Sequence, residues 1–279
     1  RTFVRVGPTT RVATPEEERR LAEKRRWGDL PFDVSPCRAA TLKDLNLRLF
    51  ELEYLPQLQP PEVLVENHRS LEQQLQALRF ATTDDPPTPT NLGILALGIE
   101  PRHYIPGDYI QFVRFDGMTL TDPIKDQKDI SGPLPEALAE LDDLFRAHIS
   151  VATDIRARLE IRHPDYPIVA LQQLARNAVM HRAYDATHAP VRINWFRDRI
   201  EISNPGGPFG QVTRENFGEP GITDYRNPHL AEVMKNIGYV QKFGVGIALA
   251  RKELDKNGNS LPDFQIEVNH VLVTLRRRA

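Results

Sequence analysis

The chain has 279 residues, of which 40% are hydrophobic and 27% charged, and a formal net charge of -2. This composition is that of a globular protein of about two domains, and the near-neutral charge excludes a chain whose whole surface attracts nucleic acid. Because Cys37 is the single cysteine, an intrachain disulfide and a thiolate zinc site are excluded; no apolar run suits a membrane helix, and the cytoplasm is the expected compartment.

The first predicted elements are a short strand and a helix. Residues 2–6, TFVRV, alternate apolar positions as a strand does. Thr14 is the expected N-cap of the helix, with Pro15 at its first position and Glu17 three residues after the cap. A lone strand leaves its backbone edges unpaired, so we expect residues 2–6 to end a preceding domain or to pair elsewhere in the chain. The start at Arg1 rather than Met agrees with a fragment or a processed product.

Residues 41–150 are predicted to form a mixed α/β connecting domain. Helices are expected from Thr41 to about Glu53, ending before Pro56, and over about 62–80. After a proline-rich connector, the remaining expected elements are strands at 91–99 (NLGILALGI) and 108–117 (DYIQFVRFDG), a loop or edge strand at 123–132, and a helix from Pro135 to about Arg158.

Residues 151–279 show a different alternation of elements. The expected order is an apolar helix at 168–181, two strands within 191–204, glycine-rich loops over 204–227, helices at 229–238 and 245–258, and a hairpin at 263–277. Helices on one face of a mixed, mostly antiparallel sheet predict an α+β fold with a C-terminal α/β sandwich.

Three motifs in this last segment indicate a binding site. Gln173, Asn177 and His181 are spaced i, i+4, i+8, so they project from one face of an apolar helix, although a solvated polar face is the plainer interpretation. Asn204 to Gly207, NPGG, follow a strand directly. Gly244 and Gly246 open a helix, where backbone N–H groups can approach an anion closely.

The order and spacing of these motifs resemble the GHKL nucleotide-binding architecture of gyrase B, the ninety-kilodalton heat-shock chaperones, histidine kinases and MutL. The resemblance implies that ATP or ADP binds with Mg²⁺, which Asn177 helps to hold. The cofactor-binding residues that it implies are Asn177, His181, Asn204, Gly206, Gly207, Arg226, Gly244 and Gly246.

The chain resembles one branch more closely: bacterial and archaeal transcriptional regulators that join an AlbA/Schlafen-like N-terminal domain to this ATPase-like domain. The shared residues are Asn177-Ala178, His181-Arg182, Tyr184, Asp198 to Ile202, Asn204 to Gly207, Arg226-Asn227-Pro228 and Gly244 to Ile247. The resemblance implies that residues 1–40 are the remnant of the AlbA/Schlafen-like domain and a linker helix. It further implies that residues 41–150 form the connecting domain and residues 151–279 the ATP-binding domain. It also implies DNA or RNA as a partner through the missing domain, no membrane partner, and a homo-oligomer.

Two departures from the family pattern bear on catalysis. Gln173 occupies the position of the expected catalytic Glu, and an amide cannot act as a general base, so no catalytic residue is assigned. Ala183 replaces an expected Asp. Asn204 stands where related ATPases place an adenine-reading Asp, and it can still accept a hydrogen bond from the base. We therefore expect nucleotide binding with weak or no hydrolysis, as in a nucleotide-sensing transcriptional regulator.

Two other interpretations stay open on the sequence. A degenerate fold used as a scaffold for dimerisation or partner binding would also show Gln173 and Ala183. A slow ATPase in a nucleic-acid-processing or defence system would need another carboxylate, such as Asp185 or Glu201. The histidines are scattered, and none forms a pair with the spacing of a metal-binding helix.

Overall fold

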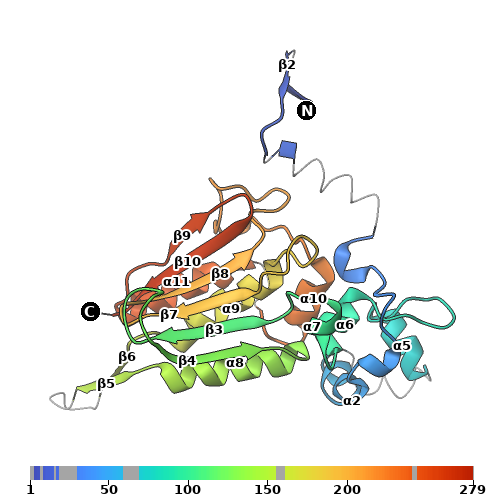
Figure 1. The fold of residues 1–279 in the computed structure, drawn as a ribbon, viewed down its shortest axis with the longest axis horizontal. Helices are drawn as coiled ribbons and strands as arrows, with labels where there is room; N and C mark the ends of the chain where they lie inside the picture. The colour runs from blue at the N-terminus through green and yellow to red at the C-terminus, as the bar shows by residue number, and fades with distance from the viewer. Residues whose placement is uncertain are drawn as a thin grey trace.

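A six-stranded sheet forms the centre of the computed structural model, which describes residues 3–6, 9–15, 17–18, 30–58, 69–154, 161–240 and 244–278. The strand order is β4-β3-β7-β8-β10-β9 (Figure 1). The strands are β3 (Ile110–Phe115), β4 (Ile124–Ile130), β7 (Val191–Trp195), β8 (Arg199–Pro205), β9 (Asp263–Ile266) and β10 (His270–Arg276). β3 runs parallel to β7, and the other neighbours are antiparallel. The predicted mixed, mostly antiparallel sheet is confirmed.

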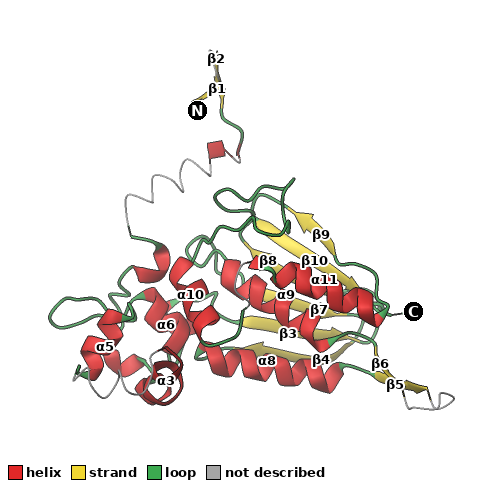
Figure 2. Ribbon diagram, turned by 180° about the vertical axis from the view of Figure 1, so that it is seen from behind, coloured by secondary structure: helices red, strands yellow, loops and turns green. Residues whose placement is uncertain are grey.

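Three helices lie on one face of this sheet, as Figure 2 shows: α8 (Leu134–His148), α9 (Ile168–His181) and α11 (Gly246–Asn257). Every second residue of β7 and β8 is buried beneath them, including Ile193, Trp195, Ile200 and Ile202. α11 ends at Gly258, whose φ of 81° is easily adopted only by a residue without a Cβ. The α+β sandwich predicted for the C-terminal part is therefore confirmed.

The sheet takes strands from both sides of residue 150. β3 and β4 precede that position and extend the sheet beyond β7, with the register Ile110↔Val191 and Ile110↔Ile130. A single buried cluster also contains side chains from both sides, such as Leu138 and Leu174. The division into segments 1–40, 41–150 and 151–279 stays a prediction.

Helical turns pack beside the sheet over residues 30–104. They are η1 (Phe32–Val34), η2 (Leu42–Asp44), α2 (Leu47–Leu49), the π-helical turn η3 (Phe50–Tyr54), α3 (Leu55–Leu58), α5 (Leu71–Ala77), α6 (Asn91–Leu97) and α7 (Pro101–Tyr104). The helix expected from Thr41 to about Glu53 begins only at Leu47, since Thr41 precedes the separate 3-10 turn η2. It also continues past Glu53, because Pro56 lies inside α3, after the π-helical turn η3. The early part of the helix expected at 62–80 lies outside the described residues.

The strand expected at 91–99 is wrong, because residues 91–97 form helix α6. Thr90 caps this helix by accepting a hydrogen bond from the Gly93 amide at 3.1 Å. Residues 92–97 are all buried, so the segment has no polar face and its sequence carries no helical period. Gly93 lies against the Phe80 backbone, where a Cβ would overlap the carbonyl.

The helix expected from Pro135 to about Arg158 ends ten residues earlier than predicted. It ends at His148, whose imidazole ion-pairs with Asp126 at 2.8 Å and stacks on Phe112. Residues 151–154 (β5) then pair with 161–164 (β6) as a small hairpin. The segment expected to be a loop or edge strand at 123–132 is the edge strand β4.

The N-terminal segment 3–6 is a strand, β1, that pairs with β2 (Thr9–Val12). The expected capping pair is also present: Glu17 N donates to Thr14 Oγ1 at 3.2 Å, and Thr14 N donates to a Glu17 carboxylate oxygen at 2.9 Å. The remainder of the expected linker helix, residues 19–29, lies outside the described residues. Among the helices that the structure describes, none has the length and apolar character needed to span a bilayer.

Candidate functional site

A cavity of about 360 Å³ lies among α9, α10 (Pro228–Asn236), the start of α11 and the loop that follows β8. Eight of the residues singled out in the sequence line it together: Gln173, Asn177, His181, Asn204, Gly206, Gly207, Gly244 and Gly246. The two of these residues that lie farthest apart in the sequence, Gln173 and Gly246, are separated by 73 positions. A cavity of this size with a few convergent polar groups is typical of a small-molecule site.

The polar row of α9 faces this cavity, so it is not a solvated face. Gln173 is only 7% exposed, and its Oε1 lies 3.3 Å from the position that a Cβ on Gly246 would take. α9 and α11 therefore approach closely at the point where α11 begins. Asn177, one turn further along α9, presents an amide to the cavity.

Glycine is required at three positions of the site for different physical reasons. Gly206 has a φ of 99°, and its amide donates to the Asn269 carbonyl at 2.7 Å. Gly244 has a φ of 63°, and a Cβ there would overlap the methyl group of Thr223. Gly207 is required by packing, since a Cβ would collide with the carbonyl oxygens at 267 and 268. At Gly206 and Gly244 the backbone itself, without a side chain, therefore forms part of the cavity wall.

His181 is a neutral side chain of the cavity at physiological pH. Its burial, followed by the positive charge of Arg226, lowers the pKa of His181 to about 4, while Asp224 acts in the opposite direction. The imidazole stacks on Tyr225, with ring centroids 5.5 Å apart and planes at 11°. His181 therefore offers a neutral imidazole, stacked on Tyr225, to the cavity and adds no positive charge.

Arg226 is the sequence-predicted residue that does not line the cavity. Its guanidinium carbon lies 4.7 Å from the centroid of the Phe209 ring, and its Nε is 3.5 Å from the position of a Cβ on Gly206. Arg226 therefore lies beside the glycine turn. In this arrangement of the 209–226 loop it supports the wall of the cavity and does not project into it.

The loop 209–226 covers one side of the cavity and rests on the C-terminal elements. Arg214 forms an ion pair with Glu267 at 3.1 Å, and Arg251 of α11 donates to the Gly218 carbonyl at 3.3 Å. The rings of Phe217 and Phe264 are 5.4 Å apart. These contacts hold the loop against β9 and α11.

The carboxylates suggested as alternative catalytic bases lie elsewhere. Glu201 alternates with the buried Ile200 and Ile202 on β8, so it points to the opposite face of the sheet, where it pairs with Arg199 at 2.7 Å. Asp185 is exposed and does not line the cavity. The described carboxylates that do line it are Glu219, Asp224 and Glu232.

Several lining residues were not singled out in the sequence. Glu232 and Lys235 come from α10, and the apolar wall is formed by Met180, Phe209, Val212, Phe217, Ile222, Val240 and Val271, together with Ile247 of the shared Gly244–Ile247 motif. The i, i+3 spacing of Glu232 and Lys235 is equally typical of a solvent-exposed helix face, so it does not indicate a site. Only the packing of α10 shows that this face borders the cavity.

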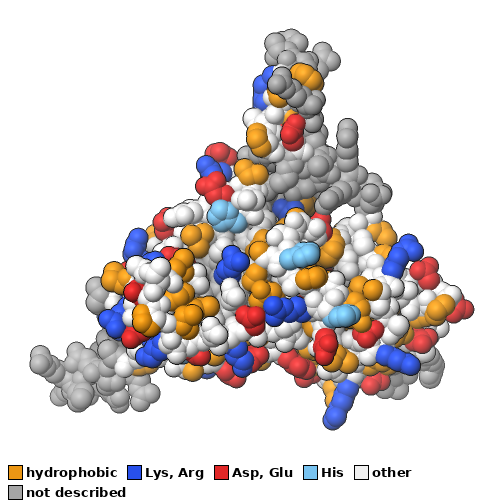
Figure 3. All heavy atoms as spheres, viewed as in Figure 1, with side chains coloured by type: hydrophobic (Ala, Val, Ile, Leu, Met, Phe, Trp, Pro, Cys, Tyr) orange, Lys and Arg blue, Asp and Glu red, His pale blue; other side chains and the backbone are white. Residues whose placement is uncertain are grey.

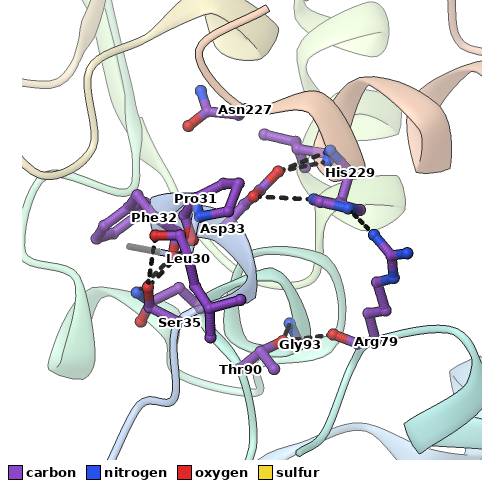
Figure 4. A network of polar contacts seen from close by, with 12 residues as sticks. Leu30, Pro31, Phe32, Asp33, Ser35, Arg79, Thr90, Gly93, Asn227 and His229 are labelled. Atoms are coloured by element: carbon purple, nitrogen blue, oxygen red, sulfur yellow. Dashed lines mark hydrogen bonds and ion pairs between the residues drawn. The ribbon is translucent and has the colours of Figure 1, made fainter. Parts of the chain in front are cut away.

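Helix α10 is held in place from a distant part of the chain, as Figure 4 shows. Asp33 is fully buried and accepts hydrogen bonds from the amides of His229 at 2.7 Å and Leu230 at 3.1 Å, the first turn of α10. The same carboxylate contacts His229 Nδ1 at 3.1 Å, and the Arg79 guanidinium contacts the other ring nitrogen. A buried carboxylate at this position satisfies the helix amides and complements the helix dipole.

The residues of the cavity fit Mg²⁺ carried by a nucleotide better than a metal held by protein alone. The described part of the chain contains no group of three His, Cys, Asp or Glu that could hold a metal. Asn177 offers a carbonyl oxygen, and Mg²⁺ completes its shell readily with phosphate oxygens and water.

Comparison with known proteins agrees with this arrangement. Residues 188–275 match the family described as "Putative ATP-dependent DNA helicase recG C-terminal". This match supports a GHKL-like ATP-binding domain in the C-terminal part of the chain, in agreement with the α/β sandwich.

The fold is also similar to the crystal structure of the DIP2311 protein from Corynebacterium diphtheriae, with a TM-score of 0.67 and 20% sequence identity. The alignment covers 100% of this chain and 54% of that chain, so this chain spans about half the length of the protein it resembles. At this identity the likeness shows a shared fold alone. No protein of curated function matches the chain.

Proposed function

We propose that the cavity binds ATP or ADP together with Mg²⁺, and that nucleotide occupancy, without efficient hydrolysis, regulates the protein. One observation carries the proposal: the fold brings the polar row of α9, the turn at Asn204–Gly207 and the glycines that open α11 to the wall of a single cavity. The ATPase-type family match over residues 188–275 supports the same choice of ligand.

Each part of the wall suits one part of a nucleotide. The first amides of α11, from Gly246 onward, are free of intrahelical partners and suit phosphate oxygens. Asn177 suits the accompanying Mg²⁺ through its amide oxygen. Asn204 is 7% exposed and offers an acceptor to an exocyclic amine of a base. The apolar side chains of the 209–226 loop suit the faces of the base.

The proposed weakness of ATP hydrolysis follows from the amide side chain of Gln173. It lies in the cavity against the start of α11, where a base for an attacking water would be needed, and an amide cannot accept the proton. Glu201 faces away from the site and Asp185 lies outside it, so neither replaces the missing carboxylate. The carboxylates that line the cavity, Glu219, Asp224 and Glu232, come from the 209–226 loop and α10 and not from the α9 row that holds Gln173.

We further propose that binding is read out through the 209–226 loop and α10. The ligand regulates only if it binds one arrangement of these elements more tightly than another. Since α10 contacts Asp33 and hence the 30–104 region, the altered arrangement would reach the N-terminal side of the chain. There it would change the engagement of DNA or RNA, or association with a second copy.

The test is calorimetric titration of the purified chain with ATP and Mg²⁺. We expect saturable binding that Asn177→Ala and Gly244→Asp each weaken at least tenfold. Gly221→Asp is the matched control for Gly244→Asp, because Gly221 also has positive φ, 84°, but has nothing within 4 Å and does not line the cavity. Absence of binding to folded protein would leave the scaffold interpretation.

A second measurement addresses hydrolysis. Gln173→Glu restores a carboxylate at the start of α11, so we expect it to raise the rate of ATP hydrolysis by roughly a hundredfold over the unaltered chain, the contribution typical of a positioned general base. Hydrolysis by the unaltered chain at ordinary ATPase rates would refute the non-hydrolytic part of the proposal.

A further inference from the structure

The cavity extends along α9 between two different ends. Gln173 lies against the start of α11, whose first amides suit phosphate oxygens. Two residues beyond His181, the last residue of α9, the Ala183 amide donates to the Pro205 carbonyl at 2.8 Å and so holds the turn at 204–207 there. From Gln173 to His181 the helix rises by about 12 Å. A nucleotide with its phosphates at α11 therefore extends its base toward this turn.

The walls around Asn204 are largely apolar. Val271 lies opposite Asn204 in the register of β8 and β10, and it also lines the cavity. Met180 adds a side chain from the end of α9, and Phe209 adds one from just after the turn. His181 contributes an imidazole that is neutral at physiological pH. These surroundings suit the flat face of a base better than a phosphate.

The side-chain amide of Asn204 is buried but is not locked by the protein. It is 7% exposed, its Nδ2 donates only to the Pro205 carbonyl at the long distance of 3.5 Å, and its Oδ1 accepts no hydrogen bond from the described residues. Asn227, which is 1% exposed, is different: its Nδ2 donates to the Met180 and Arg182 carbonyls at 3.0 and 2.8 Å, which fixes its orientation. Asn204 therefore has hydrogen-bonding capacity left for a ligand, in either orientation of its amide.

We propose that Asn204 is the residue that determines base specificity, and that it accepts a purine with either an amino or an oxo group at position 6. An amide both accepts and donates hydrogen bonds, whereas a carboxylate only accepts them. Adenine offers an amino donor at position 6, and guanine and hypoxanthine offer an oxo acceptor there. The Asn204 oxygen accepts from the first, and after a half-turn of the amide its nitrogen donates to the second.

The inference rests on the proposed nucleotide binding and names the class of base that the site takes. It places 6-oxopurine nucleotides beside ATP and ADP as ligands of the same cavity. The half-turn costs little, because it gives up only the long contact with Pro205. A purine with hydrogen at position 6 would instead leave the buried amide of Asn204 without a partner, and this lowers affinity.

The experiment measures the binding of three triphosphates to the full chain with Mg²⁺ by calorimetry. ATP has an amino group at position 6, inosine triphosphate (ITP) an oxo group, and purine riboside triphosphate a hydrogen. We expect the affinities for ATP and ITP to agree within about threefold, and both to exceed the affinity for purine riboside triphosphate roughly tenfold. ITP is used in place of GTP because the 2-amino group of guanine adds a second difference.

Asn204→Ala removes the group that reads position 6. We expect the three affinities to converge within about twofold in this variant, whereas a role of Asn204 in stability alone would leave their ratios unchanged. Asn194→Ala is the matched control, because Asn194 also lies on a strand of the sheet but alternates with buried residues and points to the opposite face. If Asn204→Ala fails to fold, the three ligands on the unaltered chain still decide the question.

The outcomes separate this inference from the proposed function. If the unaltered chain binds ATP at least about tenfold more tightly than ITP, or binds all three ligands equally, the inference is wrong and nucleotide binding stands. If it binds none of them, the proposed function itself is wrong and the inference with it. Equal binding of ATP and ITP, with their advantage lost in Asn204→Ala and kept in Asn194→Ala, supports the inference.

Discussion

Replacement of Asp33 by Ala is expected to destabilise the protein far more than its place in a short 3-10 turn suggests. The carboxylate is fully buried and accepts hydrogen bonds from the His229 and Leu230 amides at 2.7 and 3.1 Å and from the His229 ring at 3.1 Å. Alanine leaves these donors in place without their acceptor. The chain between Asp33 and α10 is nearly two hundred residues long, so no local element can replace the contact.

The size of the effect follows from the number of donors left without a partner. Each buried amide that loses its acceptor costs about 1–3 kcal/mol, whereas the His229 ring, whose side chain is 14% exposed, can regain part of its hydration. We therefore expect Asp33→Ala to lower the free energy of unfolding by about 3 kcal/mol, in the range of strong N-cap losses combined with a buried network. Asp33→Asn keeps a carbonyl acceptor and should cost about 1 kcal/mol.

Urea denaturation followed by circular dichroism measures this difference. With a urea dependence of about 3 kcal/mol/M, the midpoint should fall by about 1 M for Asp33→Ala. Asp84→Ala, an exposed aspartate in the 82–90 loop, is the control and should change stability by less than about 0.5 kcal/mol. Amide hydrogen exchange should accelerate at His229 and Leu230 first. A loss below about 1 kcal/mol with unchanged exchange there would show that Asp33 does not cap α10.

Three further predictions follow from single side chains. Burial raises the pKa of Asp108 to about 7, whereas the unfolded pKa is about 4, so the stability that Asp108 contributes is lost as pH rises from about 4 to about 7. Because the lowered pKa of His181 acts in the opposite direction, the effect is measured as a difference: relative to the unaltered chain, the urea midpoint of Asp108→Asn should be higher at pH 8 than at pH 5. Tyr166 has a buried hydroxyl without a described partner, so Tyr166→Phe should leave the melting temperature unchanged or raise it, and a drop of several degrees would reveal a partner. Gly244→Ala combines a φ of 63° with overlap onto Thr223, so it should cost about 1 kcal/mol or more in denaturation, while Gly221→Ala, at 84° but in open space, isolates the contribution of φ alone.

On the face that Figure 3 draws, the charges of the described residues form no patch of one sign. Figure 3 shows basic, acidic and hydrophobic side chains interspersed over the described residues on that face. The edge strand β4 carries charges of both signs, such as Lys128 and Asp129, which discourages pairing with another strand.

The local parts of this structure could be predicted because short-range sterics and hydrogen bonds determine them. The helix α9 with its polar row, the capping pair of Thr14 and Glu17, and the left-handed residue Gly258 after α11 each depend on residues within a few positions. The hairpins β7–β8 and β9–β10 follow equally from alternation and turn residues.

Prediction failed where burial on all sides removed the periodic signal. The segment 91–97 is apolar throughout, so strand and helix were not distinguishable, and only its packing among the other helical turns selects a helix. Trp195 and Phe112, which pack with His148 at the end of α8, likewise belong to strands remote from it in the sequence.

By itself the sequence determined the type of fold and eight residues of the cavity wall, since spacing along one helix and glycine at the turns are local properties. The tertiary structure alone decided that α10 contributes Glu232 and Lys235, that Arg226 lies on Phe209, and that Asp33 holds the start of that helix. The physical reason is that these contacts join segments far apart in the chain. Their formation depends on the burial of apolar surface over the whole molecule, which no local sequence pattern predicts.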